Sequence, residues 1–532
     1  MITTMLLTGV AALMATILIV PVLKLVAKKV NLVDHPDKRR KLQKNAIPLV
    51  GGVAVFLVST AIIVFLAIYR GDELIAHAAD QMELVGLLIA ASFLMLVGII
   101  DDFYGLRGRQ KLFGQIIAAS ILIGFGYSFE SVGFYGFEIS FGHFALLIMY
   151  VWILGCINSV NLLDGADGFA TSLGIMITGG LCVISYIYGR PFDALICAAM
   201  CGALIGFLRF NFPPATAYLG DAGSMLIGLV VAAIAIRSAT KQPMAYALFA
   251  PVALLAIPII DTAAAIIRRQ LTGKSIYSTD RGHLHHTLIR KGLSPRLALL
   301  WFVILCSTTV IGATFSAVYR QAEYAFISII AVLCCLIGFK YFGVLEFKLV
   351  SNKAMGVGKK FLTLGKSGPT NKERQVKVRL QGNRNWESVW AGISEFAKKF
   401  DLVEIVLDLD LPWIHESFHA NYYVPIETEH PIEWRSEIPL QLEDRIIGRV
   451  LVTGDAHVSP ANEVLPRLIE MLADLEPYIL ATVNLQAYPP PANVAGKSTT
   501  AVALGNEVPE LESSAGITGN GETRANSLDV RV

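Results

Sequence analysis

Apolar residues gather in eleven runs of 16 to 23 residues over the first two thirds of the chain. A helix needs about 20 apolar residues to cross a hydrocarbon core of about 30 Å, so each run predicts a transmembrane helix. The runs cover residues 4–26, 48–69, 84–100, 112–127, 144–162, 166–188, 192–208, 218–236, 244–266, 297–319 and 323–343. The pattern therefore predicts an all-α polytopic membrane protein with about eleven transmembrane helices.

The long apolar runs end at residue 343, and the sequence after it is more polar. Residues 344–374 read as a linker, residues 375–486 as a small soluble α/β domain, and residues 487–532, rich in Pro, Gly, Ser, Asn and Thr, as a disordered tail. We therefore expect a membrane-embedded domain over residues 1–343 that is followed by a separate soluble domain of unknown role.

Smaller elements can also be predicted from periodicity. Alternation of apolar and charged residues predicts strands at 376–380 and 407–411, and helical spacing predicts a helix over 386–400. Ser459, followed by Pro460, is a typical start for a second helix. In the membrane part, the glycines and alternating aromatics of 128–142 predict a short hairpin.

Composition and charge narrow the class of protein. Hydrophobic residues make up 54% and charged residues 16% of the 532 residues, against about 45–50% and about 25% in soluble proteins. A formal net charge of +2 argues against a nucleic-acid partner. All seven cysteines lie in apolar runs without a C-x-x-C pair, which excludes a disulfide framework and a cysteine-based zinc site.

Positive charge is concentrated in alternate loops. The stretches 27–47, 101–111 and 267–296 are rich in Lys and Arg, whereas the intervening loops hold only Arg70, Arg190, Arg237, Lys241 and Arg320. The positive-inside rule then predicts an outside N-terminus and a cytoplasmic C-terminus. The first run has no positive residue before it and no small-residue cleavage site after it, so it reads as a retained helix.

Carboxylates and amides stand at several inner ends of the apolar runs, where polar groups often mark function. Asp101 and Asp102 end the third run, within VGIIDDFYGLRGRQKLFGQ. In NSVNLLDGADGF, Asn158, Asn161 and Asp164 recur every third residue and share one helical face.

The remaining polar groups stand in glycine-rich or histidine-rich segments. Asp167 lies in the turn between Gly165 and Gly168, and Asp221 lies between Gly220 and Gly223. Arg281, His283, His285 and His286 lie in the long loop DRGHLHH, which lacks zinc-site spacing and favours a phosphate-bearing ligand. Asp261 stands seven residues before Arg268, which is typical of a structural ion pair on one helix face.

These carboxylates all belong to segments that the charge pattern places on the cytoplasmic side. Two carboxylates about 6 Å apart repel each other by about 3 kcal/mol at an effective dielectric near 20, so a converged cluster requires a cation. Oxygen ligands suit Mg²⁺, with Mn²⁺ as the alternative, and Mg²⁺ commonly binds one or two carboxylates together with substrate phosphates. The chemistry indicated is metal-assisted transfer at a phosphate between one soluble and one lipid-borne substrate.

Residues 45–300 resemble the polyprenyl-phosphate N-acetylhexosamine-1-phosphate transferase superfamily. The matching blocks, in order, are PLVGG (48–52), DDFYGL (101–106), NSVNLLDGADG (158–168), NFPPATAYLGDAGS (211–224), PIID (258–261) and HLHH (283–286). The C-terminal domain lies outside the resemblance.

The resemblance implies a bacterial inner-membrane enzyme in which polyprenyl phosphate attacks a UDP-N-acetylhexosamine and UMP is released. By motif position, Asp221 and Asn161 would bind Mg²⁺, and Asp101, Asp102 and Asp164 would be the catalytic carboxylates. The substrate would contact Asn158, Asp167, Arg281, His283, His285 and His286. A phosphate monoester is largely ionised near neutral pH, so we expect positioning to matter more than a general base.

The HLHH form resembles the UDP-GlcNAc-type members, and the phospho-N-acetylmuramoyl-pentapeptide transferase type is the alternative. From other classes, a polytopic transporter and a membrane anchor for the C-terminal domain are the rivals. A homodimer, and any partner of the C-terminal domain, are left open.

Overall fold

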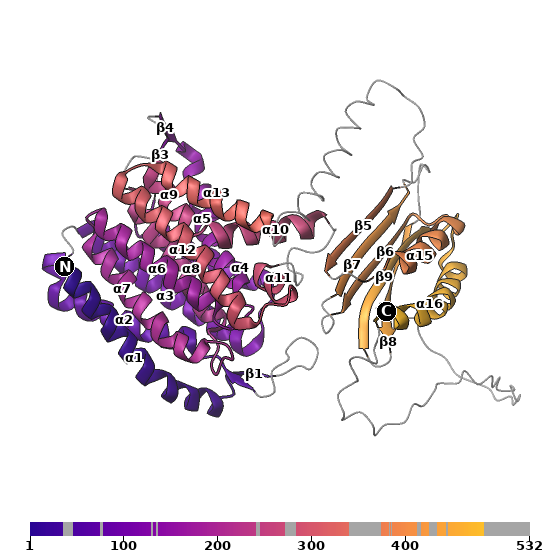
Figure 1. Cartoon of the computed structure of the whole chain (residues 1–532), viewed down its shortest axis with the longest axis horizontal. Coiled ribbons are helices and arrows are strands. Elements are labelled where there is room, and N and C mark those ends of the chain that lie inside the picture. Colours follow the sequence, from indigo (N-terminus) through magenta and orange to yellow (C-terminus); the bar gives the residue numbers. More distant parts are fainter. Residues whose placement is uncertain are drawn as a thin grey trace, which may run out of the picture. The chain divides into compact units, whose positions relative to one another are not determined.

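The computed structural model describes residues 1–35, 46–74, 78–128, 131–134, 137–240, 245–271, 283–339, 374–381, 384, 386–411, 416–424, 433–442 and 445–483. The predicted linker, the predicted disordered tail and Arg281 therefore lie outside the described residues, apart from the last residue of the linker. The helical part and the sheet-containing part are each described by themselves (Figure 1).

The described residues between 2 and 338 lie mostly in helices (Figure 1). The described helices are α1 (Ile2–Lys29), α2 (Gly51–Leu74), α3 (Ala78–Tyr104), α4 (Gly108–Gly124), α5 (Ala145–Leu163), α6 (Phe169–Ile187), α7 (Pro191–Asn211), α8 (Gly220–Thr240), α9 (Ala245–Leu254), α10 (Ala256–Leu271), α11 (Leu284–Arg290), α12 (Pro295–Tyr319) and α13 (Ala322–Gly338). Two short antiparallel pairs join them: β1 (Val33–Asp34) with β2 (Ile47–Pro48), and β3 (Ser131–Phe134) with β4 (Phe137–Ser140). The second pair confirms the predicted hairpin.

Eight of these helices are long and apolar enough to cross a membrane, which agrees with a polytopic membrane protein. They are α1, α2, α3, α5, α6, α7, α8 and α12. Helices α4 and α13 also coincide with predicted runs, but each has 17 residues. The predicted run 244–266 forms two helices, α9 and α10, that are divided at Leu255. Eight of the described helices are therefore long enough to be counted as membrane spans, and the count of eleven remains a prediction.

Helix α8 is the most enclosed of these spans. In its most apolar stretch 94% of the residues are buried, against 22% in that of α1. Helix α8 packs against α3 and α5. Glycines allow this close approach: a Cβ on Gly98 of α3 would lie 2.3 Å from Cα of Ala222. On α2, a Cβ on Gly52 would lie 2.3 Å from the backbone nitrogen of Gly223. The start of α8 is therefore clamped between α2 and α3.

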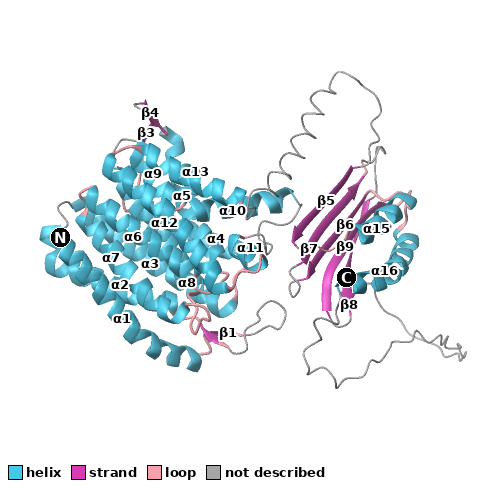
Figure 2. Ribbon diagram, viewed as in Figure 1, coloured by secondary structure: helices cyan, strands magenta, loops and turns pink. Residues whose placement is uncertain are grey.

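The C-terminal part contains a five-stranded antiparallel sheet with the strand order β5-β7-β6-β9-β8. Helices α15 and α16 lie on one side of it (Figure 2). The bounds are β5 (Arg374–Gln381), α15 (Glu387–Lys399), β6 (Glu404–Leu411), β7 (Glu416–Tyr423), β8 (Glu433–Leu442), β9 (Arg445–Asp455) and α16 (Ala461–Val483).

Alternation along the strands explains why α15 and α16 pack on one side of the sheet. Leu407 and Leu409 of β6 are fully buried, whereas Asp408 and Asp410 between and beside them point to the other side and are more exposed. Trp386 and Trp390 are fully buried at the α15 side. The predicted strands and helices of this part all coincide with observed elements, and β7, β8 and β9 were not predicted.

Candidate active site

The C-terminal end of α3 meets the N-terminal end of α8. The Asp102 carboxylate accepts hydrogen bonds from the backbone N–H of Asp221, at 2.9 Å, and of Ala222, at 3.4 Å. A carboxylate at this position satisfies the free N–H groups of the first helical turn and interacts favourably with the helix dipole. Gly220 has φ +78°, and a Cβ on it would lie 2.6 Å from Asp102 Oδ2. The GDAGS sequence therefore folds around Asp102.

Asp101 organises the turn from α3 to α4. Its Oδ1 accepts a hydrogen bond from the backbone N–H of Leu106 at 2.7 Å, and Gly105 within this turn has φ +66°. Asp101 is 5% exposed. The chain reverses at this turn, and α4 brings Lys111 back to the same carboxylate.

Lys111 joins the carboxylates of two helices. Its ammonium donates to Asp221 Oδ2 at 2.7 Å and forms an ion pair with Asp101. The Lys111 side chain is 22% exposed and that of Asp221 33% exposed, so the contact is half-buried.

Helix α5 contributes the amide groups. Asn161 donates to Asp221 Oδ1 and, at 2.9 Å, to the Ser224 hydroxyl. Asn158, one turn earlier, is paired with Gln115 of α4: its amide N–H donates to Gln115 Oε1 at 2.7 Å. Asn161 thus lies at the Asp221 carboxylate, whereas Asn158 positions α5 against α4.

The loop after α5 carries the other two predicted carboxylates. Asp164 caps the C-terminal end of α5, where burial raises the pKa of its carboxyl well above the ordinary value and the nearby Asp221 and Asp102 carboxylates add to this shift. Asp167 Oδ2 accepts a hydrogen bond from the backbone N–H of Ala215 at 2.8 Å. Asp164 therefore belongs to the carboxylate cluster, and Asp167 holds the loop that contains Pro213 and Pro214.

The HLHH segment was predicted to lie in a loop, but the structure places His285 and His286 in α11, with His283 at its N-cap. Asp261 of α10 fixes this start: it contacts His283 Nδ1 at 2.8 Å and accepts a hydrogen bond from the backbone N–H of Leu284 at 2.9 Å. The expected ion pair of Asp261 involved Arg268, whose side chain is outside the described part of the structure. The observed partner of Asp261 is His283.

His285 lies against the loop that contains Asp164. A Cβ on Gly165 would lie 3.2 Å from His285 Nε2, and the His285 ring packs on Phe169 with 5.5 Å between centroids. Burial lowers the pKa of His285 well below its ordinary value, and His286 and His283 lower it further. Neither ring nitrogen has a hydrogen-bond partner among the described residues, so His285 is a neutral group with unused hydrogen-bonding capacity.

The donor groups at Asp221 fit a hard cation. They are carboxylate, amide and hydroxyl groups, and the carboxylates of Asp101, Asp102 and Asp164 lie in the same cluster. Among the described residues, no group of three or more His, Cys, Asp or Glu side chains is placed to hold a metal ion by itself. A Mg²⁺ ion at Asp221 would therefore need water and substrate phosphates for most of its coordination, as is common for this ion. Asn161 would have to rotate its amide to present the oxygen.

Three residues at or beside this cluster were missed by the sequence analysis, namely Ser224 of α8 and Lys111 and Gln115 of α4. The spacing of four between Lys111 and Gln115 places both on one face of α4, toward α5 and α8. The sequence analysis counted Lys111 only as a positive charge in a loop. Its spacing of four from Gln115 could have indicated that both side chains lie on one face of a helix.

A second polar cluster lies at the opposite end of α3 and α8. Arg237 donates to Asp193 Oδ1 at 2.9 Å and pairs with Asp80 at 3.1 Å and with Glu83. Arg190 pairs with Asp193 at 3.2 Å. Asp193 is 1% exposed and Arg237 7% exposed. Helices α3, α7 and α8 are thus held together by buried charge at this end.

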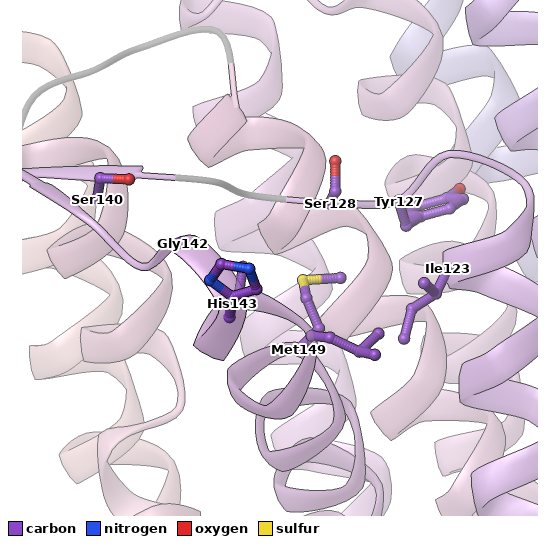
Figure 3. A pocket seen from close by; sticks show the side chains of 9 residues that line it. Ile123, Tyr127, Ser128, Ser140, Gly142, His143 and Met149 are labelled. Atoms are coloured by element: carbon purple, nitrogen blue, oxygen red, sulfur yellow. The ribbon is translucent and has the colours of Figure 1, made fainter.

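A cavity of about 430 Å³ adjoins that opposite end, where Tyr127 donates a hydrogen bond to the Glu83 carbonyl at 3.1 Å. Its lining includes Ile123, Tyr127, Ser128, Ser140, His143 and Met149 (Figure 3). None of the predicted site residues lines it, so this cavity is separate from the carboxylate cluster.

Known proteins share the segments that build the cluster. Residues 84–239 match glycosyl transferase family 4. The chain is 29% identical over 293 residues to a probable undecaprenyl-phosphate N-acetylglucosaminyl 1-phosphate transferase of Bacillus subtilis. The aligned residues make up 55% of this chain and 79% of that relative. It is 29% identical over 355 residues to a decaprenyl-phosphate N-acetylglucosaminephosphotransferase of Mycobacterium tuberculosis, with 62% and 86% covered. It is also 29% identical over 307 residues to the undecaprenyl-phosphate alpha-N-acetylglucosaminyl 1-phosphate transferase of Escherichia coli K12, with 56% and 79% covered.

Proposed function

We propose that this chain, whose residues 84–239 match glycosyl transferase family 4, is a membrane-embedded transferase that moves N-acetylhexosamine 1-phosphate from a UDP-sugar to polyprenyl phosphate and releases UMP. The observation that carries this proposal is the meeting of Asp101 and Asp102 from α3 with Asp221 from α8. A cluster of carboxylates and one lysine at the end of a membrane-embedded bundle suits chemistry at a phosphate.

The reaction is a single displacement. A phosphate oxygen of the lipid forms a bond to the β-phosphorus of the UDP-sugar, the bond from that phosphorus to the bridging oxygen breaks, and UMP leaves with the bridging oxygen. Magnesium held by Asp221 and Asn161 would neutralise charge on the pyrophosphate. The other requirement is positioning, because the attacking phosphate is already an anion near neutral pH.

The chain's own residues supply that positioning. Lys111 carries an ammonium to the centre of the cluster, where it can donate to phosphate oxygens. Asp102 fixes the start of α8 and thereby the direction of the Asp221 carboxylate. His285 lies beside the Asp164 loop, and the His283 ring stacks on the His285 ring with 5.9 Å between centroids, so that both rings suit contacts to the sugar or the second phosphate.

GlcNAc is the sugar that we propose, because each of the three relatives carries it in its name. The product would be the first lipid-linked intermediate of a cell-envelope glycan. We place the carboxylate cluster on the cytoplasmic side of the bacterial inner membrane, since the Lys- and Arg-rich stretches 27–47, 101–111 and 267–296 flank it in sequence.

The direct test incubates membranes that contain the protein with labelled UDP-GlcNAc and polyprenyl phosphate, with and without Mg²⁺. We expect label in the lipid phase and release of UMP only with Mg²⁺. Asp221→Asn should lower turnover by at least about 100-fold, the scale reported for removing one key electrostatic group, while leaving membrane insertion intact. The matched control is Asp410→Asn, an exposed carboxylate of β6, which should not change turnover. Equal turnover in wild type and Asp221→Asn would refute the assignment.

Removal of residues 344–532 separates this function from that of a membrane anchor. If the membrane part is the enzyme, the truncated chain keeps transfer of label to lipid. Loss of transfer in a chain that still inserts would show that the C-terminal part is needed for catalysis.

A further inference from the structure

We propose that Lys111 is an internal counter-ion that occupies the cation position of the carboxylate cluster until a metal and a phosphate-bearing substrate bind together. This inference rests on the proposed function. It adds that the substrate-free protein binds a divalent cation weakly, and that Lys111 is the cause.

The first support is that both carboxylate oxygens of Asp221 are already used. Oδ1 accepts a hydrogen bond from Asn161, and Oδ2 accepts one from the Lys111 ammonium at 2.7 Å. Asn161 can change its role by rotating its amide, because the oxygen then takes the place of the nitrogen. Lys111 has no acceptor atom to offer and must move away.

The second support is the charge balance of the cluster. Asp101, Asp102, Asp164 and Asp221 lie together, and Lys111 is the cation that the described structure pairs with them. Opposite charges in contact attract each other strongly where water is partly excluded. Lys111 therefore stabilises the cluster when no metal is bound, and it repels a divalent cation that enters beside it.

The third support is that Lys111 lies close enough to solvent for its ammonium to be hydrated when it leaves the carboxylates. Its side chain is 22% exposed and lies near the start of α4, next to the exposed residues Arg109 and Gln110. The lysine side chain is flexible and its ammonium is strongly hydrated, so the ammonium can move from the carboxylates to another anion nearby. Substrate phosphate oxygens would give the displaced ammonium a new charge-assisted hydrogen bond.

The consequence is coupling between metal and nucleotide. Without a phosphate ligand, metal binding leaves Lys111 displaced and unpaired; with one, the same displacement forms a new contact. The two ligands should therefore strengthen each other's binding by the same factor. Removing the lysine charge should improve metal binding to the substrate-free protein and should reduce the coupling.

The experiment measures Mn²⁺ binding to the detergent-solubilised full chain from the loss of the free-ion EPR signal, with and without UDP as the probe nucleotide. Lys111→Gln should bind Mn²⁺ at least about tenfold more tightly than wild type in the absence of UDP, and UDP should change its affinity less. Arg109→Gln removes the same charge from an exposed position of the same helix and should bind Mn²⁺ as the wild type does.

Two other outcomes are distinguishable. If Lys111→Gln binds Mn²⁺ no better than wild type while Asp221→Asn loses binding, the counter-ion inference is wrong and the metal assignment stands. If Asp221→Asn binds Mn²⁺ like wild type, the metal assignment of the proposed function is itself wrong. Thermal unfolding of each variant checks that the fold is retained.

Discussion

The carboxylate of Asp102 hydrogen-bonds to the backbone N–H of Asp221, which links the last turn of α3 to the first turn of α8. Two aspartates that are 119 residues apart in sequence thus play unlike roles. Asp102 binds backbone and positions a helix, whereas Asp221 presents its side chain to the centre of the cluster. The neighbouring Asp101 holds the turn to α4.

Asp102→Ala should lower both stability and turnover, because it removes the acceptor for the first N–H groups of α8. Loss of a capping side chain costs about 1 kcal/mol. Asp102→Asn keeps an acceptor oxygen and should retain more of both properties. Thermal unfolding and lipid-labelling rates measure the difference. Equal losses in the two variants would mean that the charge of Asp102 matters and its cap does not.

Gly98→Ala should reduce turnover by about tenfold or more, because its new Cβ would lie 2.3 Å from Cα of Ala222 and α3 would have to move away from α8. Overpacking of this kind costs about 1–3 kcal/mol. Gly155→Ala is the matched control, since a Cβ there meets no heavy atom within 4 Å. An active Gly98→Ala variant would contradict the need for this close approach.

Asp261→Ala should raise the KM for the UDP-sugar and leave the Mn²⁺ affinity unchanged. The substitution removes both contacts that fix the start of α11, and each lost hydrogen bond to a charged group is worth about 1.5–3 kcal/mol. Asp261→Asn keeps an acceptor for the Leu284 N–H and should lie between Ala and wild type. Steady-state kinetics with varied UDP-sugar test this, and an unchanged KM in Asp261→Ala would argue against a substrate role of the histidines.

Arg237→Met should destabilise the helical part by about 3 kcal/mol, because it leaves the Asp193 carboxylate, 1% exposed, with one cation fewer. Arg237→Lys keeps the charge and should lose less. Thermal unfolding in detergent measures both variants. A melting temperature that does not change in Arg237→Met would show that Arg190 alone neutralises Asp193.

The sequence predicts most of the cluster because its residues stand at the ends of apolar runs. Asp101, Asp102 and Asp221 lie next to helix termini, and the charge pattern of the loops assigns those termini to one side. Asn161 was placed correctly beside Asp221 by its resemblance to the family and not by its spacing. Which atoms contact each other depends on helix packing, and one sequence does not show that packing.

The differences between the predicted and the observed structure have physical causes. The HLHH segment is polar and reads as a loop, yet Asp261, 22 residues before His283, supplies the contacts that start α11. Arg190 and Arg237 read as charges in outer loops, whereas they pair inside the bundle with acids from α3 and α7. In each case a partner far away in sequence decides the local structure, and periodicity contains no information about it.

The enclosure of α8 restricts the route of a hydrophobic substrate. Since 94% of the residues in its most apolar stretch are buried, α8 offers almost no surface to surrounding acyl chains. The isoprenoid tail of the polyprenyl phosphate that we propose as substrate would then rest on the outer helices, and only its charged head would reach Asp221. Discrimination between tail lengths should accordingly be weak at the reacting centre and should arise, if at all, on the bundle's periphery.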